Sequence, residues 1–400
     1  FQNYLDTNGV YKQHYVPINL VRTQDSGFVI TYTISDTSGW AETTLVKFNK
    51  NGFIVWNKAF KGTFIETNLN QHLMIWGIIE TSDNGFVLTG ATRGLNSTNI
   101  QCVILKTDSL GNKEWLDILG IDAGYLHETG VNILELPDQQ ILLGYGESSS
   151  TNDLYGNTKL VKYSPTGTKI WTKSYGGSFA EGNVKLNQCS EGNLLLSYAK
   201  GYYHDYYTSY QIEILKLDSN GNIMQTKNYG PYYPSRYGSY NIWGAKLNSK
   251  DELYISGNTS DHLASNMQAF LLKTDSNGDS IYMRYYNKLD SVPYNADFSV
   301  WDMVLEPEGG VSFVGQVMEM TIGGFAGGYI IRTDSFGCMY QGCHTIGIED
   351  PLDKYSNILI YPNPAHSEVT IELSESLRQA TEIRIYNSVG HLIISQNINS

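Results

Sequence analysis

Tyrosine is concentrated in one part of this sequence. Ten tyrosines fall between Tyr202 and Tyr240, in two runs separated by an apolar stretch. A tyrosine ring presents a flat apolar face and a hydroxyl, which suits stacking on a sugar ring or gripping a protein surface. The same rings could instead pack long loops against the body of the protein, because buried tyrosine hydroxyls usually find a hydrogen-bond partner. The candidate ligand-binding residues of this tyrosine-rich patch are Tyr206, Tyr207, Tyr232, Tyr233, Arg236 and Tyr237.

Three tryptophans recur at one fixed distance from a glycine. Trp76, Trp243 and Trp301 each precede a glycine by 14 residues, and these glycines are Gly90, Gly257 and Gly315. The tryptophans therefore mark equivalent positions in three repeated units. Their indoles either fill the space between neighbouring units, because aromatic rings dominate packing, or face a central channel and stack on a ligand. All three are candidate ligand-binding residues.

The sequence contains no recognisable catalytic motif. A hydrolase would need two paired carboxylates, or a serine, a histidine and an aspartate held together. The eight histidines are scattered, and the neighbours His204-Asp205 and Asp261-His262 would point to opposite faces of a strand. The sequence also has no Gly-x-Ser-x-Gly elbow, phosphate loop or His-Glu-x-x-His motif. We therefore predict no catalytic residue. An enzyme stays an open alternative, because two carboxylates brought together from separate repeat units would leave no local motif in the sequence.

One acidic loop has part of the spacing of a calcium site. Asp275-Ser276-Asn277-Gly278-Asp279 offers side-chain oxygens at alternating positions. Its glycine is fourth, whereas a calcium loop has glycine sixth, and the glutamate at the twelfth position is absent. A hairpin turn capped by its own aspartate explains the pattern better. We therefore expect no metal site and no cofactor.

The four cysteines predict one disulfide. Cys338 and Cys343 are five positions apart, which suits a small disulfide loop in an oxidising compartment. Cys102 lies in an apolar run and Cys189 in a polar turn, and neither has a second cysteine or a histidine at metal-ligand spacing. We expect both of these to be inert thiols.

A hairpin signature that returns six times must position all of these residues. Its clearest copy, residues 104–115, is an apolar run ending in lysine, a polar turn with glycine, and a second run with an aromatic residue. The glycines of the six copies are Gly52, Gly111, Gly167, Gly221, Gly278 and Gly337, spaced by 59, 56, 54, 57 and 59 residues. A near-constant period of this size, with four short strands in each unit, is typical of a β-propeller. The sequence predicts an all-β fold, with a six-bladed β-propeller of four-stranded blades over residues 1–343.

The two ends of the repeat region are expected to meet. Residues 10–15 could supply the fourth strand of the last unit, which would close the ring and remove the open edges that invite aggregation. The predicted bridge between Cys338 and Cys343 would then hold the end in place. Because the chain begins at Phe1, we also expect either that a leader has been removed or that the start is cropped.

The repeat is lost after residue 343. Residues 344–358 carry no turn-bounded strand and are predicted to be a linker. Residues 359–400 predict a small partial β-sandwich, whose three strands are expected at residues 368–373, 382–386 and 391–396.

Two parts of the chain resemble known families. The repeat, in copies such as residues 103–115 and 271–279, resembles propeller repeats that are common in secreted bacterial proteins of unknown ligand. The tail resembles the type A C-terminal sorting domain of type IX secretion cargo, through Tyr361-Pro362-Asn363-Pro364, residues 369–373, and residues 383–390 ending in Gly390. Such domains usually continue through further strands, so we expect this one to be incomplete. The resemblance implies that the secretion machinery carries the protein across the outer membrane, for release or for anchoring at the cell surface.

Charge and hydrophobicity restrict the partners. The net charge of −13 argues against nucleic acid, which needs clustered lysine and arginine, and against docking on an anionic membrane. No apolar run approaches the roughly 20 residues that span a bilayer. We expect a monomer, extracellular or on the outer cell surface, that binds a glycan or a surface protein without catalysis. An extracellular polysaccharide hydrolase or lyase is one alternative, and a structural spacer is another.

Overall fold

The computed structural model is all-β in the residues that it describes. These are residues 13–14, 19–35, 41–60, 71–94, 100–119, 132–148, 156–176, 181–204, 207–230, 239–260, 267–286, 296–319, 326–339, 358–361, 370–373, 382–386 and 392–397. The chain divides into two compact units, Phe1–Leu305 with Phe313–Ile330, and Glu306–Ser312 with Ile331–Ser400. Within the described ranges, no helix has the length and apolar character needed to cross a membrane.

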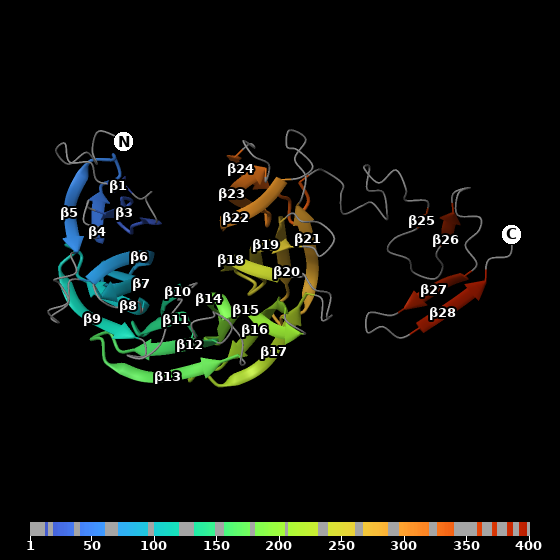
Figure 1. Ribbon diagram of the computed structural model, residues 1–400, viewed down its shortest axis with the longest axis horizontal. Coiled ribbons are helices and arrows are strands. Elements are labelled where there is room, and N and C mark those ends of the chain that lie inside the picture. The colour runs from blue at the N-terminus through green and yellow to red at the C-terminus, as the bar shows by residue number, and fades with distance from the viewer. Residues whose placement is uncertain are drawn as a thin grey trace. The chain divides into compact units, whose positions relative to one another are not determined.

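Six blades follow one another along the chain and are arranged around a common axis (Figure 1). The first blade comprises β2 (Asn19–Arg22), β3 (Phe28–Ser35), β4 (Ala41–Phe48) and β5 (Ile54–Phe60). The second comprises β6 (Gln71–Glu80), β7 (Phe86–Gly94), β8 (Ile100–Thr107) and β9 (Lys113–Leu119). The third comprises β10 (Asn132–Glu135), β11 (Ile141–Ser148), β12 (Gly156–Tyr163) and β13 (Lys169–Tyr175).

The remaining three blades continue the same order. The fourth comprises β14 (Glu181–Gln188), β15 (Leu194–His204), β16 (Tyr207–Leu217) and β17 (Ile223–Tyr229). The fifth comprises β18 (Ser239–Leu247), β19 (Leu253–Ser260), β20 (Met267–Thr274) and β21 (Ser280–Tyr286). The sixth comprises β22 (Ala296–Leu305), β23 (Val311–Glu319) and β24 (Ala326–Arg332) in its described part. The predicted six-bladed propeller is confirmed.

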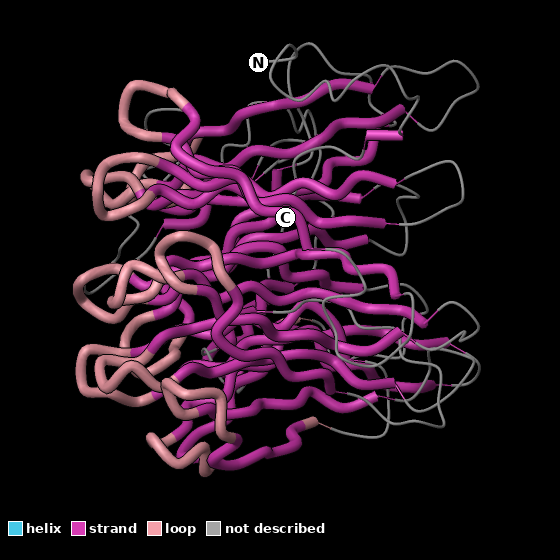
Figure 2. The backbone as a smooth tube through the Cα atoms, turned by 90° about the vertical axis from the view of Figure 1, so that its left-hand side faces the viewer, coloured by secondary structure: helices cyan, strands magenta, loops and turns pink. Residues whose placement is uncertain are grey.

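The connections between strands define two ends of the propeller. The turns that join the first strand to the second, and the third to the fourth, are tight. In the second blade, for example, Asn84 N donates to Thr81 O at 2.8 Å and Gly111 N donates to Asp108 O at 3.1 Å. Gly111 has a φ of 75°, in the left-handed region that glycine adopts without a Cβ penalty. Figure 2 shows these turns along one side of the sheets, which we call the tight-turn end. Because successive strands alternate in direction, the other connections start from the opposite side, which we call the long-connection end.

The lysine of the repeat signature belongs to the fold. It lies near the end of the third strand of a blade, and its ammonium reaches the acidic residue of the first tight turn. Lys106 Nζ lies 2.8 Å from Asp83 Oδ2, and the lysine side chain is only 5% exposed. The same pair recurs as Lys47–Asp25 at 2.7 Å and Lys273–Glu252 at 3.0 Å. Since a buried ammonium needs a partner, these lysines stabilise the turn and are not available for other chemistry.

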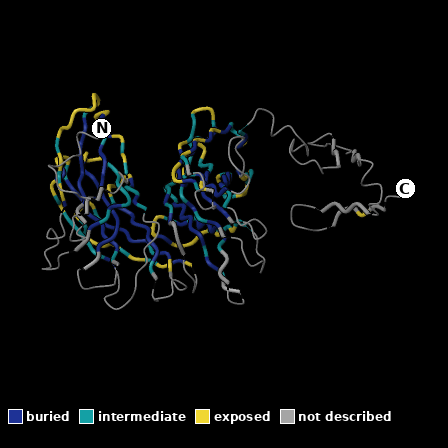
Figure 3. The backbone as a smooth tube through the Cα atoms, turned by 45° about the horizontal axis from the view of Figure 1, so that its top comes forward, coloured by how far each residue is buried: buried dark blue, intermediate teal, exposed yellow. Residues whose placement is uncertain are grey.

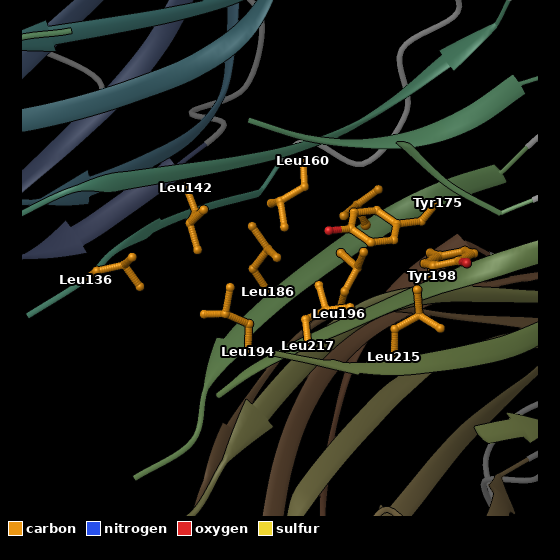
Figure 4. Close-up of a cluster of buried hydrophobic side chains, with 11 residues drawn as sticks. Leu136, Leu142, Leu160, Tyr175, Leu186, Leu194, Leu196, Tyr198, Leu215 and Leu217 are labelled. Atoms are coloured by element: carbon orange, nitrogen blue, oxygen red, sulfur yellow. The ribbon is translucent and has the colours of Figure 1, made fainter. Parts of the chain in front are cut away.

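Neighbouring blades bury each other's faces. Figure 4 shows the cluster between the third and fourth blades, where Leu142 and Leu160 pack with Leu186 and Leu196. Figure 3 shows that burial is concentrated inside the blades and that many turns are exposed. The outer strands add a polar contact, because a lysine of one blade reaches the turn after the signature glycine in the next. These contacts are Lys58–Asn112, Lys173–Asn222 and Lys227–Asp279, at 3.0, 2.6 and 2.6 Å.

The expected closure of the ring by residues 10–15 is wrong in the part that the structure describes. Residues 13–14 form β1 (Gln13–His14), which pairs with β3 of the first blade, with Gln13 opposite Ser35. β4 occupies the other edge of β3, so β1 and β2 both lie along its inner edge. A strand on the inner edge of the first blade cannot also be the outer strand of the sixth.

The described cysteines have the predicted states, one in a disulfide and two as free thiols. Cys338 is disulfide-bonded, and its predicted partner Cys343 lies outside the described residues. Cys102 and Cys189 are buried free thiols. The pairing of Cys338 with Cys343 therefore stays a prediction.

The tail forms two antiparallel strand pairs. β25 (Ile358–Tyr361) pairs with β26 (Thr370–Leu373), and β27 (Glu382–Tyr386) pairs with β28 (Leu392–Asn397). The three predicted strands are confirmed as β26, β27 and β28, whereas β25 was not predicted. Tyr361 of the sorting motif ends β25, and Pro362, Asn363, Pro364 and Gly390 lie outside the described residues.

Candidate functional site

The two runs of the tyrosine-rich patch lead to the same place in the fold. The first run lies where β15 and β16 approach each other at the long-connection end of the fourth blade. The second run precedes β18, the innermost strand of the fifth blade. Tyr210 pairs with Ser239 in a parallel bridge, which joins the two blades into one eight-stranded sheet. This bridge places the first run beside the chain that emerges from the second.

The hairpin that carries the first run is long. β15 and β16 each contain 11 residues, whereas β7 and β8 of the second blade contain 9 and 8. Its ladder continues through Tyr202 opposite Ser209 to His204 opposite Tyr207. The additional pairs carry the tyrosine-bearing segment beyond the length of the second blade's hairpin. Tyr207 therefore lies at the start of a strand, and Tyr206 lies outside the described residues.

Part of the patch serves packing. Tyr240 is buried, its hydroxyl lies 2.9 Å from that of Tyr285, and its ring meets Phe270 edge-on with centroids 5.3 Å apart. The hydroxyl of Tyr229 donates to the carbonyl of Gly278 in the next blade. These two tyrosines fit the packing interpretation. The other predicted residues of the second run, Tyr232, Tyr233, Arg236 and Tyr237, lie outside the described residues.

A buried charged network lies beneath the first run. Glu213 is 3% exposed and accepts a hydrogen bond from the hydroxyl of Tyr198. Lys200 Nζ lies 2.6 Å from Glu213 Oε2 and also 5.7 Å from the ring centroid of Tyr202. The network therefore links the core of the fourth blade to the tyrosine-bearing hairpin. The sequence pattern does not distinguish Glu213, because the alternation Gln211-Ile212-Glu213-Ile214 has the form of a strand with its polar residues in solvent.

The third blade carries the same cross-strand pair with its charges exchanged. Lys159 Nζ lies 3.0 Å from Glu147 Oε2. Tyr145 is opposite Lys159, and Tyr198 is opposite Glu213, so the two lysine–glutamate pairs occupy matching ladder positions. The ion pair is present in both blades although the lysine and the glutamate have exchanged strands. This indicates that each pair stabilises its own blade by linking two neighbouring strands.

The predicted tryptophans occupy one structural feature of the innermost strands. Trp76 and Trp243 are the extra residues of β-bulges, since the register shifts between Ile75 and Gly77 and between Ile242 and Gly244. Opposite each bulge a glycine is required: a Cβ on Gly90, Gly257 or Gly315 would lie 2.0 Å or less from a carbonyl oxygen. The 14-residue spacing thus reports a bulge facing a glycine, and the equivalence of the three positions is confirmed.

The three indoles differ in their surroundings. Trp76 packs against the core cluster between the second and third blades, as the packing interpretation expects. Trp243 and Trp301 contact each other across the fifth and sixth blades, with ring centroids 5.1 Å apart. Trp301 is 50% exposed, and the indole N–H of Trp243 is buried without a partner among the described residues. Of the predicted tryptophans, Trp301 presents the most surface to a ligand.

The buried carboxylates of the described residues are held by protein groups. They are Glu213, in the network above, and Asp297, whose Oδ1 accepts a hydrogen bond from Met267 N at 2.6 Å. Asp275 is occupied in the same way, because its Oδ1 accepts from the backbone of Asn277 and Asp279 at 2.9 and 2.8 Å. This is the turn capping that the sequence predicted. Over the described ranges, no group of three histidine, cysteine or acidic side chains could hold a metal ion.

Comparison with known families identifies the tail. Residues 359–400 match the secretion system C-terminal sorting domain. This domain marks proteins that are secreted to the cell surface or the extracellular space and engages the secretion machinery, so the predicted address is confirmed. No curated protein matches the chain.

Comparison with solved structures gives the fold of the propeller. The GH93 α-L-arabinofuranosidase of Fusarium graminearum, in complex with arabinobiose, is similar with a TM-score of 0.50 at 9% identity, over 78% of this chain and 91% of that one. A protein of unknown function from Dyadobacter fermentans is similar with a TM-score of 0.50 at 8% identity, over 80% of this chain and 95% of that one. At such identities the similarity shows the fold alone.

Proposed function

We propose that this secreted propeller is a non-catalytic binding module that recognises a glycan or a surface protein through its tyrosine-rich patch. The observation that supports the proposal is the Tyr210–Ser239 bridge, because it joins Tyr210 of the first run to the start of β18, which directly follows the residues of the second run in the sequence. A patch built from both runs would present more aromatic surface than either run alone.

The chemistry of the patch suits recognition. Tyrosine contributes a large rigid contact surface at a low cost in conformational entropy, and its hydroxyl can bond to sugar or backbone groups. Arg236 adds a planar cation that pairs with carboxylates and stacks on rings. The patch contains no described carboxylate that is free to act as an acid or base, since Glu213 beneath it is already bound by Tyr198 and Lys200.

Polysaccharide hydrolysis or lysis is the alternative function. The arabinofuranosidase that shares this fold is a glycosidase, so the architecture is compatible with such chemistry. A hydrolase of this kind needs two carboxylates roughly 5–10 Å apart in an open site. The two buried carboxylates of the described residues, Glu213 and Asp297, each accept hydrogen bonds from protein donors. Neither of these two is therefore a candidate acid or base for such a reaction.

A glycan array tests the proposal directly. The full chain is compared with the double variant Tyr232→Ala with Tyr233→Ala. The variant should lose binding by roughly tenfold or more, since each stacked or interfacial tyrosine contributes about 1–2 kcal/mol. A parallel pull-down with cell-surface proteins covers the protein ligand.

The matched control removes two exposed apolar side chains from the tight-turn end. Phe53 and Leu110 are 67% and 59% exposed, so Phe53→Ala with Leu110→Ala removes apolar surface from that end and leaves the tyrosines unchanged. The control should bind as the wild type does. Equal binding by all three proteins would eliminate the tyrosine-rich patch as the site, and an absence of any ligand in both assays would favour a structural spacer.

A further inference from the structure

The innermost strands of the six blades share one equivalent position in their strand pairing, and the residue type at this position differs from blade to blade. It is the residue next to the bulge, on the side of the tight turn. Trp76, Trp243 and Trp301 fix it as Gly77, Gly244 and Asp302, and the ladder registers fix it in the other blades. From the first blade to the sixth, the position is occupied by Asn19, Gly77, Asn132, Lys185, Gly244 and Asp302.

The two asparagines show where side chains at this position point. Asn132 Oδ1 accepts a hydrogen bond from Leu186 N, in the innermost strand of the next blade, at 2.9 Å. Asn19 Nδ2 similarly donates to Ile75 O of the next blade at 3.5 Å. Lys185 holds the equivalent position in β14, so its longer side chain points toward the innermost strand of the fifth blade, at the axis.

Lys185 carries a charge that the protein does not pair. It makes no hydrogen bond or ion pair with any described residue, although Asp302 acts on it electrostatically from the sixth blade and Lys246 from the fifth. Burial lowers the pKa of Lys185 to about 8, yet its side chain retains intermediate exposure. A group that is surrounded by protein and still reached by solvent borders an internal wet space. At neutral pH it remains a cation there.

One unsatisfied hydroxyl lies opposite this position, and an unsatisfied indole N–H lies on the neighbouring innermost strand. Ser197 lies directly opposite Lys185 in the ladder, is fully buried, and its hydroxyl has no partner among the described residues. The indole N–H of Trp243, on the strand that Lys185 faces, also has none. Buried polar groups are normally hydrogen-bonded, so an unsatisfied hydroxyl opposite an unpaired ammonium, with a further orphaned N–H on the next innermost strand, indicates a missing acceptor. The ammonium and the indole N–H can only donate, and the hydroxyl can donate as well, so this set of groups favours an anion over a cation.

We propose that Lys185 is the centre of an anion-binding site at the propeller axis, which takes the carboxylate or sulfate group of an acidic saccharide. The half-exposed ring of Trp301, next in sequence to Asp302 and in contact with Trp243, provides a surface on which the sugar ring stacks. The saccharide part rests on the proposed function, whereas the anion site stands on Lys185 and its surroundings alone.

The distribution of charge supports a local anion site and does not support a broadly basic surface. The whole chain carries −13, so it repels polyanions in bulk. Lys246 and Asp302 are the charged residues that act electrostatically on Lys185, so the net charge of these three residues is positive. An unpaired buried ammonium is costly to a fold, and a bound anion would offset that cost.

Calorimetric titration of the full chain at pH 6.5 tests the proposal. Sodium glucuronate supplies a sugar with an anion, sodium sulfate an anion without a sugar, and glucose a sugar without an anion. We expect saturable binding of glucuronate, weaker binding of sulfate, and no binding of glucose. Lys185→Met should weaken glucuronate binding by roughly tenfold or more, because it removes a charge-assisted bond. The surface control Lys50→Met should leave it unchanged.

A second variant acts in the opposite direction. Asp302 is exposed, so Asp302→Asn should keep the fold, and it removes the negative charge that competes with the ligand. We expect it to tighten glucuronate binding by roughly three- to tenfold. Absence of saturable binding to both anions, or equal binding by the wild type, Lys185→Met and Asp302→Asn, would overturn the anion site. Equal affinity for sulfate and glucuronate would overturn the saccharide part.

The tyrosine variants separate this inference from the proposed function. Tyr232→Ala with Tyr233→Ala should still bind glucuronate at the axis. If that variant loses its array ligand while Lys185→Met changes no affinity, the inference fails and the proposed function stands. If Lys185→Met abolishes glucuronate binding while Tyr232→Ala with Tyr233→Ala changes the affinity for no ligand, the anion site at the axis is supported and the proposed role of the tyrosine-rich patch is refuted.

Discussion

Lys185→Met should make the ligand-free propeller more stable at neutral pH. Burial lowers the pKa of Lys185 from 10.5 to about 8, so the folded protein holds this proton less tightly than the unfolded chain does. Methionine has a similar length and no charge, and it removes the penalty without opening a large cavity. We expect this gain in stability even though the sequence pattern alone places Lys185 among the solvent-facing residues of its strand.

The size and pH range of the effect follow from the two pKa values. The difference between 10.5 and about 8 corresponds to about 3 kcal/mol, at about 1.4 kcal/mol for each unit. Partial contact with solvent reduces this, so we expect Lys185→Met to raise the free energy of unfolding by about 1–3 kcal/mol at pH 7. The penalty in the wild type is complete below pH 8 and disappears as the pH rises toward 10.5, so the advantage of the variant should shrink over that range.

Urea denaturation in chloride buffer at pH 7 and pH 10 measures the effect without a competing oxyanion. Wild type, Lys185→Met and Lys50→Met are compared at each pH. Lys50 is exposed in a tight turn, so its substitution should change the free energy of unfolding by less than about 0.5 kcal/mol at both pH values. A destabilised Lys185→Met variant at pH 7, or an advantage that does not shrink by pH 10, would refute the reasoning.

The remaining predictions concern the network and the turns. Glu213→Ala should lower the free energy of unfolding by about 3–5 kcal/mol, because it leaves the ammonium of Lys200 without its buried partner. Thermal unfolding measures this loss. The double variant Lys200→Met with Glu213→Leu removes both charges and should recover most of the lost stability. Gly278→Ala should cost about 1 kcal/mol or more in the same assay, because Gly278 has a φ of 78°, and a neutral result would contradict the role of this turn.

The repeat was predictable because it is a local pattern. Apolar alternation, the tight turn around Gly111 and the lysine before it are all consecutive in the chain, and the fixed period repeats them. The three-dimensional pairing of Lys106 with Asp83 spans 23 residues, so the sequence showed the lysine but not its partner. The closure by residues 10–15 failed for the same reason. Which edge of which sheet a short strand joins is decided by non-local pairing, and Gln13 pairs with Ser35.

The candidate site was only partly predictable. Composition located the tyrosine-rich patch, and the tryptophan–glycine spacing located equivalent positions, but neither reports what the side chains face. Lys185 was missed because Val184-Lys185-Leu186 has the alternation of a strand with its lysine in solvent. The bulge between Gly182 and Lys185 is what brings this lysine into register with Asn132 and Asp302. An internal alignment of the six innermost strands on the tight turns that follow them would have revealed it.

The central proposal is that the propeller binds its ligand, a glycan or a surface protein, without altering it, and the glycan case is the one that chemistry can contradict. Mass spectrometry of a bound oligosaccharide, recovered after prolonged incubation with the full chain at stoichiometric concentration, tests this most directly. We predict that the ligand is recovered quantitatively with its mass unchanged. Products shortened by hydrolysis, or carrying the unsaturated end that a lyase leaves, would contradict the account.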